Sequence, residues 1–75
     1  MTLDRSIAGH IYIIECLHLP EKTEKRLQAL GMIKGTSITV LNNKNQGTLI
    51  IKMRCTRLAL GKGISSRIEV RSQEI

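Results

Sequence analysis

The sequence has few aromatic residues: Tyr12 is the only one, and Trp and Phe are absent from its 75 residues. The longest wholly apolar run, residues 11–14, is far shorter than the roughly 20 residues that a membrane-spanning helix needs. Residues 1–5 lack the basic segment and long apolar stretch of a secretory signal. These absences predict one small cytoplasmic domain over residues 1–75.

Cysteine is also scarce. Cys16 and Cys55 are the only two, and they form no short-spaced motif. Their number would allow one disulfide. Because no export signal is visible, we expect reduced thiols buried in the core instead.

Acidic residues are rare in the second half of the chain, and this makes its charge strongly positive. Residues 1–43 carry five basic and four acidic side chains, whereas residues 44–75 carry seven basic and two acidic ones. Such a bias favours an anionic partner, which is nucleic acid, a lipid headgroup or an acidic protein surface.

What the chain does contain is mostly Ile, Leu and Val, and the β-branched members favour strands. Residues 10–17 are predicted to form the first strand. Ile11 and Ile13 would lie on one of its sides and Tyr12 and Ile14 on the other. Both sides are apolar, which is typical of a strand in a small closed barrel.

One helix is predicted over residues 21–30. Leu27 and Leu30 are three residues apart and are expected to share the face that packs inwards. Gly31 follows where a left-handed C-terminal cap is needed, and the two apolar residues after it are expected to complete the packing.

Period-2 alternation predicts four more strands, at residues 37–42, 48–54, 56–60 and 67–71. The residues expected to face the core are Ile38, Val40, Leu49, Ile51, Met53, Ile68 and Val70. An exposed hairpin loop is predicted at residues 42–47, and residues 61–66 suit a turn or one helical turn. The chain is therefore predicted to be mainly β, a small five-stranded SH3-like barrel with one short inserted α-helix.

Residues 26–40 read RLQALGMIKGTSITV. This segment resembles the family of ferrous iron transport protein A, FeoA, whose core has a basic residue and Leu, then Leu-Gly-Met, and later a Gly and a hydrophobic-x-Val strand. Residues 56–60, TRLAL, resemble the family's strand before the final turn, and Leu3 with Ala8 and Gly9 resembles its N-terminal approach. The resemblance therefore covers nearly the whole chain.

Membership of this family would imply an SH3-like fold and a cytosolic accessory role in Fe(II) uptake. The implied partner is the membrane ferrous iron transporter FeoB, which carries a GTP-hydrolysing domain on its cytosolic side. The protein would dock there and modulate GTP-coupled Fe(II) transport. The resemblance implies no small-molecule substrate and no cofactor, and it leaves direct binding of a transition metal ion and weak self-association open.

Neither catalysis nor a metal site is expected from the residues themselves. No glycine-rich phosphate loop is present. Cys16 and His18 would share one face of a strand, but no third group is predicted to orient them. A closed metal site would need His10 and Cys55 to converge on this pair, and we expect buried cysteines and solvent-exposed histidines instead. No catalytic, cofactor-binding or metal-binding residue is therefore predicted.

Partner binding is the function that the outward-facing residues favour. If Tyr12, Leu41 and Ile50 face outwards, they form an apolar patch beside the basic residues Arg54 and Arg57. We predict that these five residues bind the partner. The alternative is that the inserted helix covers this surface and that its apolar residues are ordinary core.

The rival function is that of a small basic β-barrel that binds nucleic acid, because the positive second half suits phosphates. Barrels that bind single strands usually stack bases on aromatic side chains, and only Tyr12 is available for this. No helix suited to reading a DNA groove is predicted. Nucleic acid is therefore the less favoured partner.

Overall fold

The computed structural model describes residues 1–43, 47–54 and 56–73. In chain order its elements are the 3-10 helix η1 (Leu3–Arg5), β1 (Ile11–Leu17), α1 (Glu21–Ala29), β2 (Ser37–Asn43), β3 (Leu49–Met53), β4 (Thr56–Leu60), α2 (Lys62–Ser65) and β5 (Ile68–Ser72). Every predicted strand and the predicted helix appear with bounds that differ by at most one residue. The expected hairpin loop lies partly outside the described residues, at positions 44–46.

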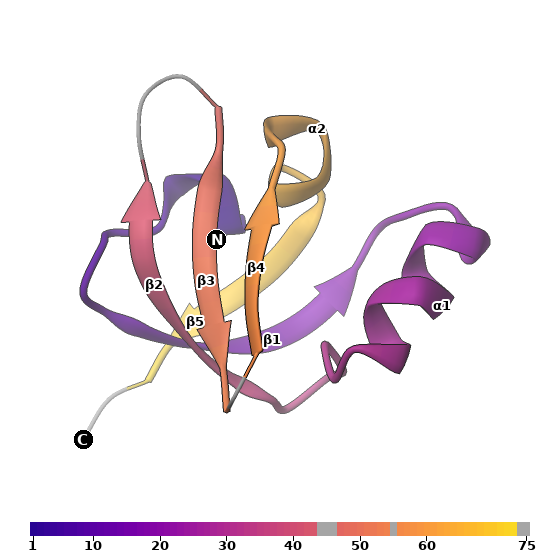
Figure 1. The fold of residues 1–75 in the computed structure, drawn as a ribbon, viewed down its shortest axis with the longest axis horizontal. Coiled ribbons are helices and arrows are strands. Elements are labelled where there is room, and N and C mark those ends of the chain that lie inside the picture. The colour runs from indigo at the N-terminus through magenta and orange to yellow at the C-terminus, as the bar shows by residue number, and fades with distance from the viewer. Residues whose placement is uncertain (44–46, 55, 74–75) are drawn as a thin grey trace.

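The five strands form one antiparallel sheet in the order β4-β3-β2-β1-β5. The sheet is strongly curved, so that β1 and β5 cross behind β2, β3 and β4 in Figure 1. A mainly β fold with five strands and one inserted helix was predicted, and it is confirmed. The curvature gives the molecule two outward surfaces, one on each side of a shared core.

The core is almost wholly aliphatic. It consists of Leu3, Tyr12, Ile14, Leu27, Met32, Ile38, Val40, Leu49, Ile51, Met53, Leu60, Ile68 and Val70. All of the strand residues that alternation predicted to face inwards from β2, β3 and β5 belong to it. The period-2 pattern therefore identified the buried side of each of these strands.

Tyr12 belongs to the core, and the prediction that it faces outwards is wrong. Its side chain is 2% exposed, whereas the neighbouring Ile11 is 44% exposed. The phenol oxygen accepts a hydrogen bond from the backbone N–H of Ile7 at 2.9 Å, so the buried hydroxyl has a partner. Both sides of β1 are apolar, and alternation alone did not show which of them faces the core.

Cys16 faces outwards, and the prediction that it is buried is wrong. The pairing of β1 with β5 shifts between Ile14, which is opposite Val70, and Cys16, which is opposite Glu69. Glu15 is the extra residue of this β-bulge, so Glu15 and Cys16 both lie on the outward side. Without the bulge, alternation from Ile14 would turn Cys16 inwards. Cys55 lies outside the described residues.

Helix α1 ends in the way the sequence predicts. The backbone N–H of Met32 donates to the carbonyl of Leu27, and that of Gly31 donates to the carbonyl of Gln28, both at 3.0 Å. This is a Schellman motif, and Gly31 provides the positive φ of 106° that the motif needs. Leu27 and Met32 are both buried, and together they fasten the end of the helix to the core.

The prediction that Leu30 packs inwards is wrong. Its side chain is 45% exposed. The helix is already finished at Ala29, and the turn at Gly31 gives the next buried position to Met32. Ile33 is 50% exposed for the same reason. Within α1 only Leu27 is buried, and the helix lies to one side of the strands (Figure 1).

The N-terminal segment covers the outer edge of β5. The carbonyl of Met1 accepts a hydrogen bond from the backbone N–H of Val70 at 2.8 Å, and Thr2 forms a bridge with Glu69. Leu3 is fully buried beneath this contact. Within residues 1–43, 47–54 and 56–73, no helix has the length and apolar character needed to cross a membrane.

Candidate docking face

The outward side of β2, β3 and β4 carries most of the residues predicted to bind a partner. We call this surface the front face and define it by Leu41, Ile50, Lys52, Arg57 and Ala59. The register of the sheet brings its members together, since Ile50 lies opposite Ala59 and Lys52 lies opposite Arg57. Leu41 is the extra residue of a bulge in β2, opposite the step from Ile51 to Ile50.

Lys52 and Arg57 are like charges that lie directly opposite each other on neighbouring strands, and both are exposed. Such a pair destabilises a sheet by roughly 0.2–1 kcal/mol. In the part of the chain that the structure describes, the ion pairs are His18–Glu69 and Lys25–Glu21, and neither includes these two residues. The repulsion would be relieved by an anionic group bound on the front face.

Arg54 follows β3 and has a positive φ of 52°, which is uncommon for a residue other than glycine. Met53 pairs with Thr56, so β3 and β4 are joined by a connection of two residues. Such short hairpin connections favour positive φ, and this explains the backbone of Arg54 without any functional role. Its exposed side chain adds a third positive charge at this end of β3.

Beside Arg54 lies an apolar groove between the α1–β2 connection and the β3–β4 hairpin. Its lining residues are Leu30, Gly31, Ile33, Thr36, Met53, Arg54 and Thr56. A second, shallower hollow adjoins it and shares Ile33, Thr36 and Arg54. The two hollows form one continuous groove at the end of the front face.

The groove combines large apolar side chains with positive charge. Leu30 and Ile33 are about half exposed, and Lys34 and Arg54 border them. The backbone beneath is held by Thr36, whose hydroxyl donates to the carbonyl of Gly31 at 3.2 Å. Sequence reasoning missed this groove because it assigned Leu30 and Ile33 to the core. The signal was Gly31, since in a Schellman motif the residue after the glycine, here Met32, is the one that packs against the helix.

Four of the five predicted docking residues therefore lie along the front face and its groove, and they are spread from one end to the other. Leu41 is 40% exposed and Ile50 is half-buried at one end of the front face. Arg57 lies further along β4, and Arg54 lies at the groove. Tyr12 is separated from them because it is in the core.

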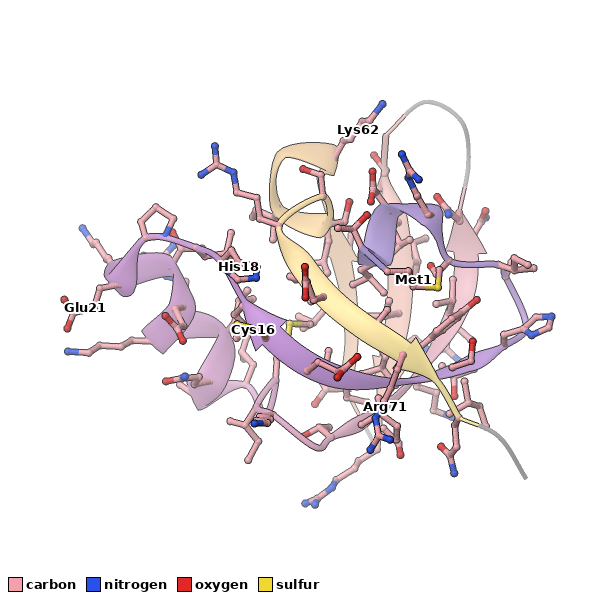
Figure 2. The ribbon with its side chains drawn as sticks, turned by 180° about the vertical axis from the view of Figure 1, so that it is seen from behind. Met1, Cys16, His18, Glu21, Lys62 and Arg71 are labelled. Atoms are coloured by element: carbon pink, nitrogen blue, oxygen red, sulfur yellow. The ribbon has the colours of Figure 1, made fainter. Side chains whose placement is uncertain are left out.

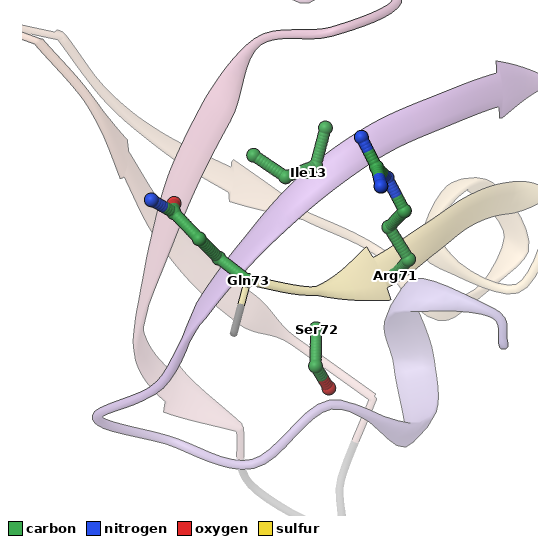
Figure 3. Close-up of a pocket in the computed structure, with 4 residues that line it drawn as sticks. All are labelled: Ile13, Arg71, Ser72 and Gln73. Atoms are coloured by element: carbon green, nitrogen blue, oxygen red, sulfur yellow. The ribbon is translucent and has the colours of Figure 1, made fainter. Parts of the chain in front are cut away.

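A third hollow lies on the other side of the molecule, where β1 begins and β5 ends. Figure 3 shows Ile13, Arg71, Ser72 and Gln73 around it. The backbone N–H of Gln73 donates to the carbonyl of Ile11 at 3.1 Å, and the Gln73 amide oxygen accepts from the Ser37 hydroxyl at 3.2 Å. These bonds fix Gln73 at the end of the sheet. The polar groups that they use therefore have a structural role, and we assign no binding role to this hollow.

Cys16, near the end of β1, and His18, the first residue after this strand, are close together on the outward side, as their spacing predicted. Their Sγ and Nδ1 atoms are 3.9 Å apart. The structure adds Glu69, which lies across from Cys16 on β5 and has a carboxylate oxygen 3.8 Å from Nε2 of His18. Only the register between β1 and β5 reveals this third residue, and it cannot be read from the sequence. Both histidines are exposed, as predicted.

Comparison of the sequence with known protein families identifies the family of this chain. A sequence model described as the FeoA domain matches residues 1–72. The chain belongs to the FeoA family. The resemblance inferred from residues 26–40 and 56–60 is thereby confirmed.

Solved structures of FeoA proteins agree. The crystal structure of an FeoA described as an iron uptake regulatory protein is 27% identical, with a TM-score of 0.87 and 97% of each chain covered. The FeoA of Chlorobium tepidum is 20% identical, with a TM-score of 0.90 over 99% of this chain and 71% of that one. The FeoA of Stenotrophomonas maltophilia, solved with zinc and described as an SH3 domain protein, is 24% identical, with a TM-score of 0.80 over 95% and 89%.

The predicted SH3-like fold is thus confirmed, and the FeoA family places the chain among the accessory proteins of ferrous iron transport. Comparison with curated protein sequences gave no match. The family is one of transport factors, and the coarse assignment agrees with the role expected from the sequence.

Proposed function

We propose that this protein acts in the cytosol, docks on the cytosolic part of an FeoB-type ferrous iron transporter and modulates GTP-coupled Fe(II) transport. Membership of the FeoA family supports the pathway. The observation that supports docking is the half-exposed pair Leu30 and Ile33 in a groove that is bordered by Lys34 and Arg54. An apolar centre with a charged rim is the usual composition of a protein–protein interface.

The chemistry of the groove defines the partner segment. Leu30 and Ile33 would receive one or two aliphatic or aromatic side chains. The basic residues around them, together with Lys52 and Arg57 on the front face, would pair with Asp or Glu on the partner. Such charge complementarity speeds association and fixes orientation more than it raises affinity.

The nucleic-acid alternative keeps its positive charge but has no exposed aromatic side chain. Tyr12 is the only aromatic residue of the chain, and its ring is buried. A single strand would therefore have phosphate contacts with Lys52, Arg54 and Arg57 but no base-stacking platform on this surface. A mobility-shift assay at two salt concentrations tests this, because phosphate-driven binding falls steeply with salt.

The docking proposal is tested by titrating the protein into the purified cytosolic domain of the transporter by calorimetry. We expect measurable binding that Ile33→Ser weakens roughly tenfold, because it removes one half-exposed aliphatic contact from the groove. Ile7→Ser is the matched control, since Ile7 is 61% exposed and lies outside the groove. The proposal fails if no binding occurs at high micromolar concentration, or if both variants bind as well as the unaltered protein.

A further inference from the structure

The outward side of β1 and β5 carries a cluster that the docking proposal does not use. Figure 2 shows this side of the molecule, with Cys16 near the end of β1 and His18 just after the strand. The bulge between Ile14 and Cys16 places the thiol on this surface, where alternation would have buried it. Bulges are frequent where a strand has to redirect a side chain for a functional purpose.

We propose that Cys16 and His18 form a surface site for a divalent transition-metal cation, with Glu69 as a positioning residue. The Sγ atom of Cys16 and the Nδ1 atom of His18 are 3.9 Å apart. A thiolate at about 2.3 Å and an imidazole nitrogen at about 2.0 Å from one tetrahedral zinc ion lie about 3.5 Å from each other. The pair therefore needs to close by only a few tenths of an ångström to hold one ion.

The second nitrogen of His18 has a carboxylate nearby, which has to move about 1 Å closer to form a hydrogen bond. Nε2 faces a carboxylate oxygen of Glu69 at 3.8 Å. A metal-bound histidine usually donates its other ring N–H to a carboxylate, which fixes the tautomer and the ring orientation. With the proton on Nε2, the lone pair of Nδ1 points towards the metal and Cys16. The backbone N–H of His18 donates to the carbonyl of Arg67 at 2.8 Å, so the backbone that carries the ring is also fixed.

The site has two protein ligands, and its remaining positions are open to water. In residues 1–43, 47–54 and 56–73 no group of three or more His, Cys, Asp and Glu side chains is placed to hold an ion directly. Glu69 acts on His18 and is not a ligand. A thiolate with an imidazole prefers Zn²⁺ or Co²⁺ to Mg²⁺ or Mn²⁺. Cys16 gives up its thiol proton when it binds the ion, so binding releases one proton.

Co²⁺ is the probe for this site, because a thiolate bound to Co²⁺ gives a charge-transfer absorption in the near ultraviolet. The reduced full-length protein is titrated with Co²⁺ and then with Zn²⁺ or Mg²⁺. We expect a saturable band that Zn²⁺ removes and Mg²⁺ leaves unchanged. The proposal is wrong if the unaltered protein gives no band, or if Zn²⁺ does not remove it.

Matched variants assign the ligands. Cys16→Ser should abolish the band and Cys55→Ser should retain it, whereas the opposite result would overturn the proposal. His18→Gln should raise the dissociation constant at least tenfold. His10→Gln, which changes the residue just before β1, should leave it unchanged. Equal effects of the two histidine variants would contradict the site.

The positioning role of Glu69 has its own signature. Glu69→Ala should raise the dissociation constant for Co²⁺ roughly tenfold while the charge-transfer band keeps its position, because the ligands are the same. Glu69→Gln should recover part of this loss, since its amide oxygen can also accept a hydrogen bond from Nε2 when the ring is bound to the ion. If Glu69→Ala binds Co²⁺ as tightly as the unaltered protein, Glu69 has no such role.

Discussion

The two outward faces of this barrel arise from the same structural device but carry different chemistry. A bulge in β2 puts Leu41 and then Asn42 on the front face, and a bulge in β1 puts Glu15 and Cys16 on the opposite face. On the front face like charges lie opposite each other across the strands. On the opposite face the His18 imidazole lies near the Glu69 carboxylate.

Two faces built on one small core can therefore differ in the chemistry of the residues that they expose. The front face keeps unrelieved positive charge next to a groove of exposed aliphatic side chains, which suits a macromolecular partner. The opposite face brings a soft ligand, an imidazole and a carboxylate together, which suits an ion. The core beneath both is the same set of buried strand residues, so changes on one face need not disturb the other.

The largest change in the free energy of unfolding is expected in the core that lies beneath both faces. Ile51 is fully buried in β3, and Ile51→Ala should lower the free energy of unfolding by about 2–5 kcal/mol. Ile50 is its half-buried neighbour on the front face, and Ile50→Ala should cost less than about 2 kcal/mol. Urea denaturation measures both. Equal losses would contradict the assignment of Ile50 to an outward face.

A smaller loss of stability is expected at Gly31, which lines the groove. Gly31 has a φ of 106°, and a Cβ atom there would meet nothing within 4 Å. Gly31→Ala should therefore cost roughly 1–3 kcal/mol through backbone strain alone. Gly61 has equal space but a φ of −74°, so Gly61→Ala should change stability by less than about 0.5 kcal/mol. Thermal unfolding of the two variants compares them, and similar melting temperatures would refute the strained turn.

Most of the fold could be predicted from the sequence, because the alternation of Ile, Leu and Val marks each strand and Gly31 marks the end of the helix. The outward positions were harder to predict. Cys16 depends on a bulge, and bulges are decided by pairing with another strand. Glu69 meets His18 only through the register of β1 against β5. Tyr12 lies on a strand with two apolar sides, so its burial depends on which side the sheet folds over.

The smallest expected effect is a gain in stability, whereas most substitutions lower it. Lys52→Glu on its own replaces a repulsive cross-strand pair with an attractive one, so it should raise the free energy of unfolding by roughly 0.2–1 kcal/mol. The same change should weaken docking on an acidic partner. Stability from urea denaturation and affinity from calorimetry are measured on one preparation. A variant that loses both would show that Lys52 acts through the fold and not through the partner.

The central claim is that the front face and its groove dock on the transporter through positive charge. The most direct measurement is the affinity for the transporter's cytosolic domain of the double variant Lys52→Glu/Arg57→Glu at low and at moderate salt. Lys22→Glu/Arg5→Glu is its control, because it changes the net charge equally at exposed residues elsewhere. We predict that the front-face variant folds with nearly unaltered stability and binds at least tenfold more weakly, most clearly at low salt, while the control keeps more of its affinity. Equal affinities of the two double variants would contradict the account.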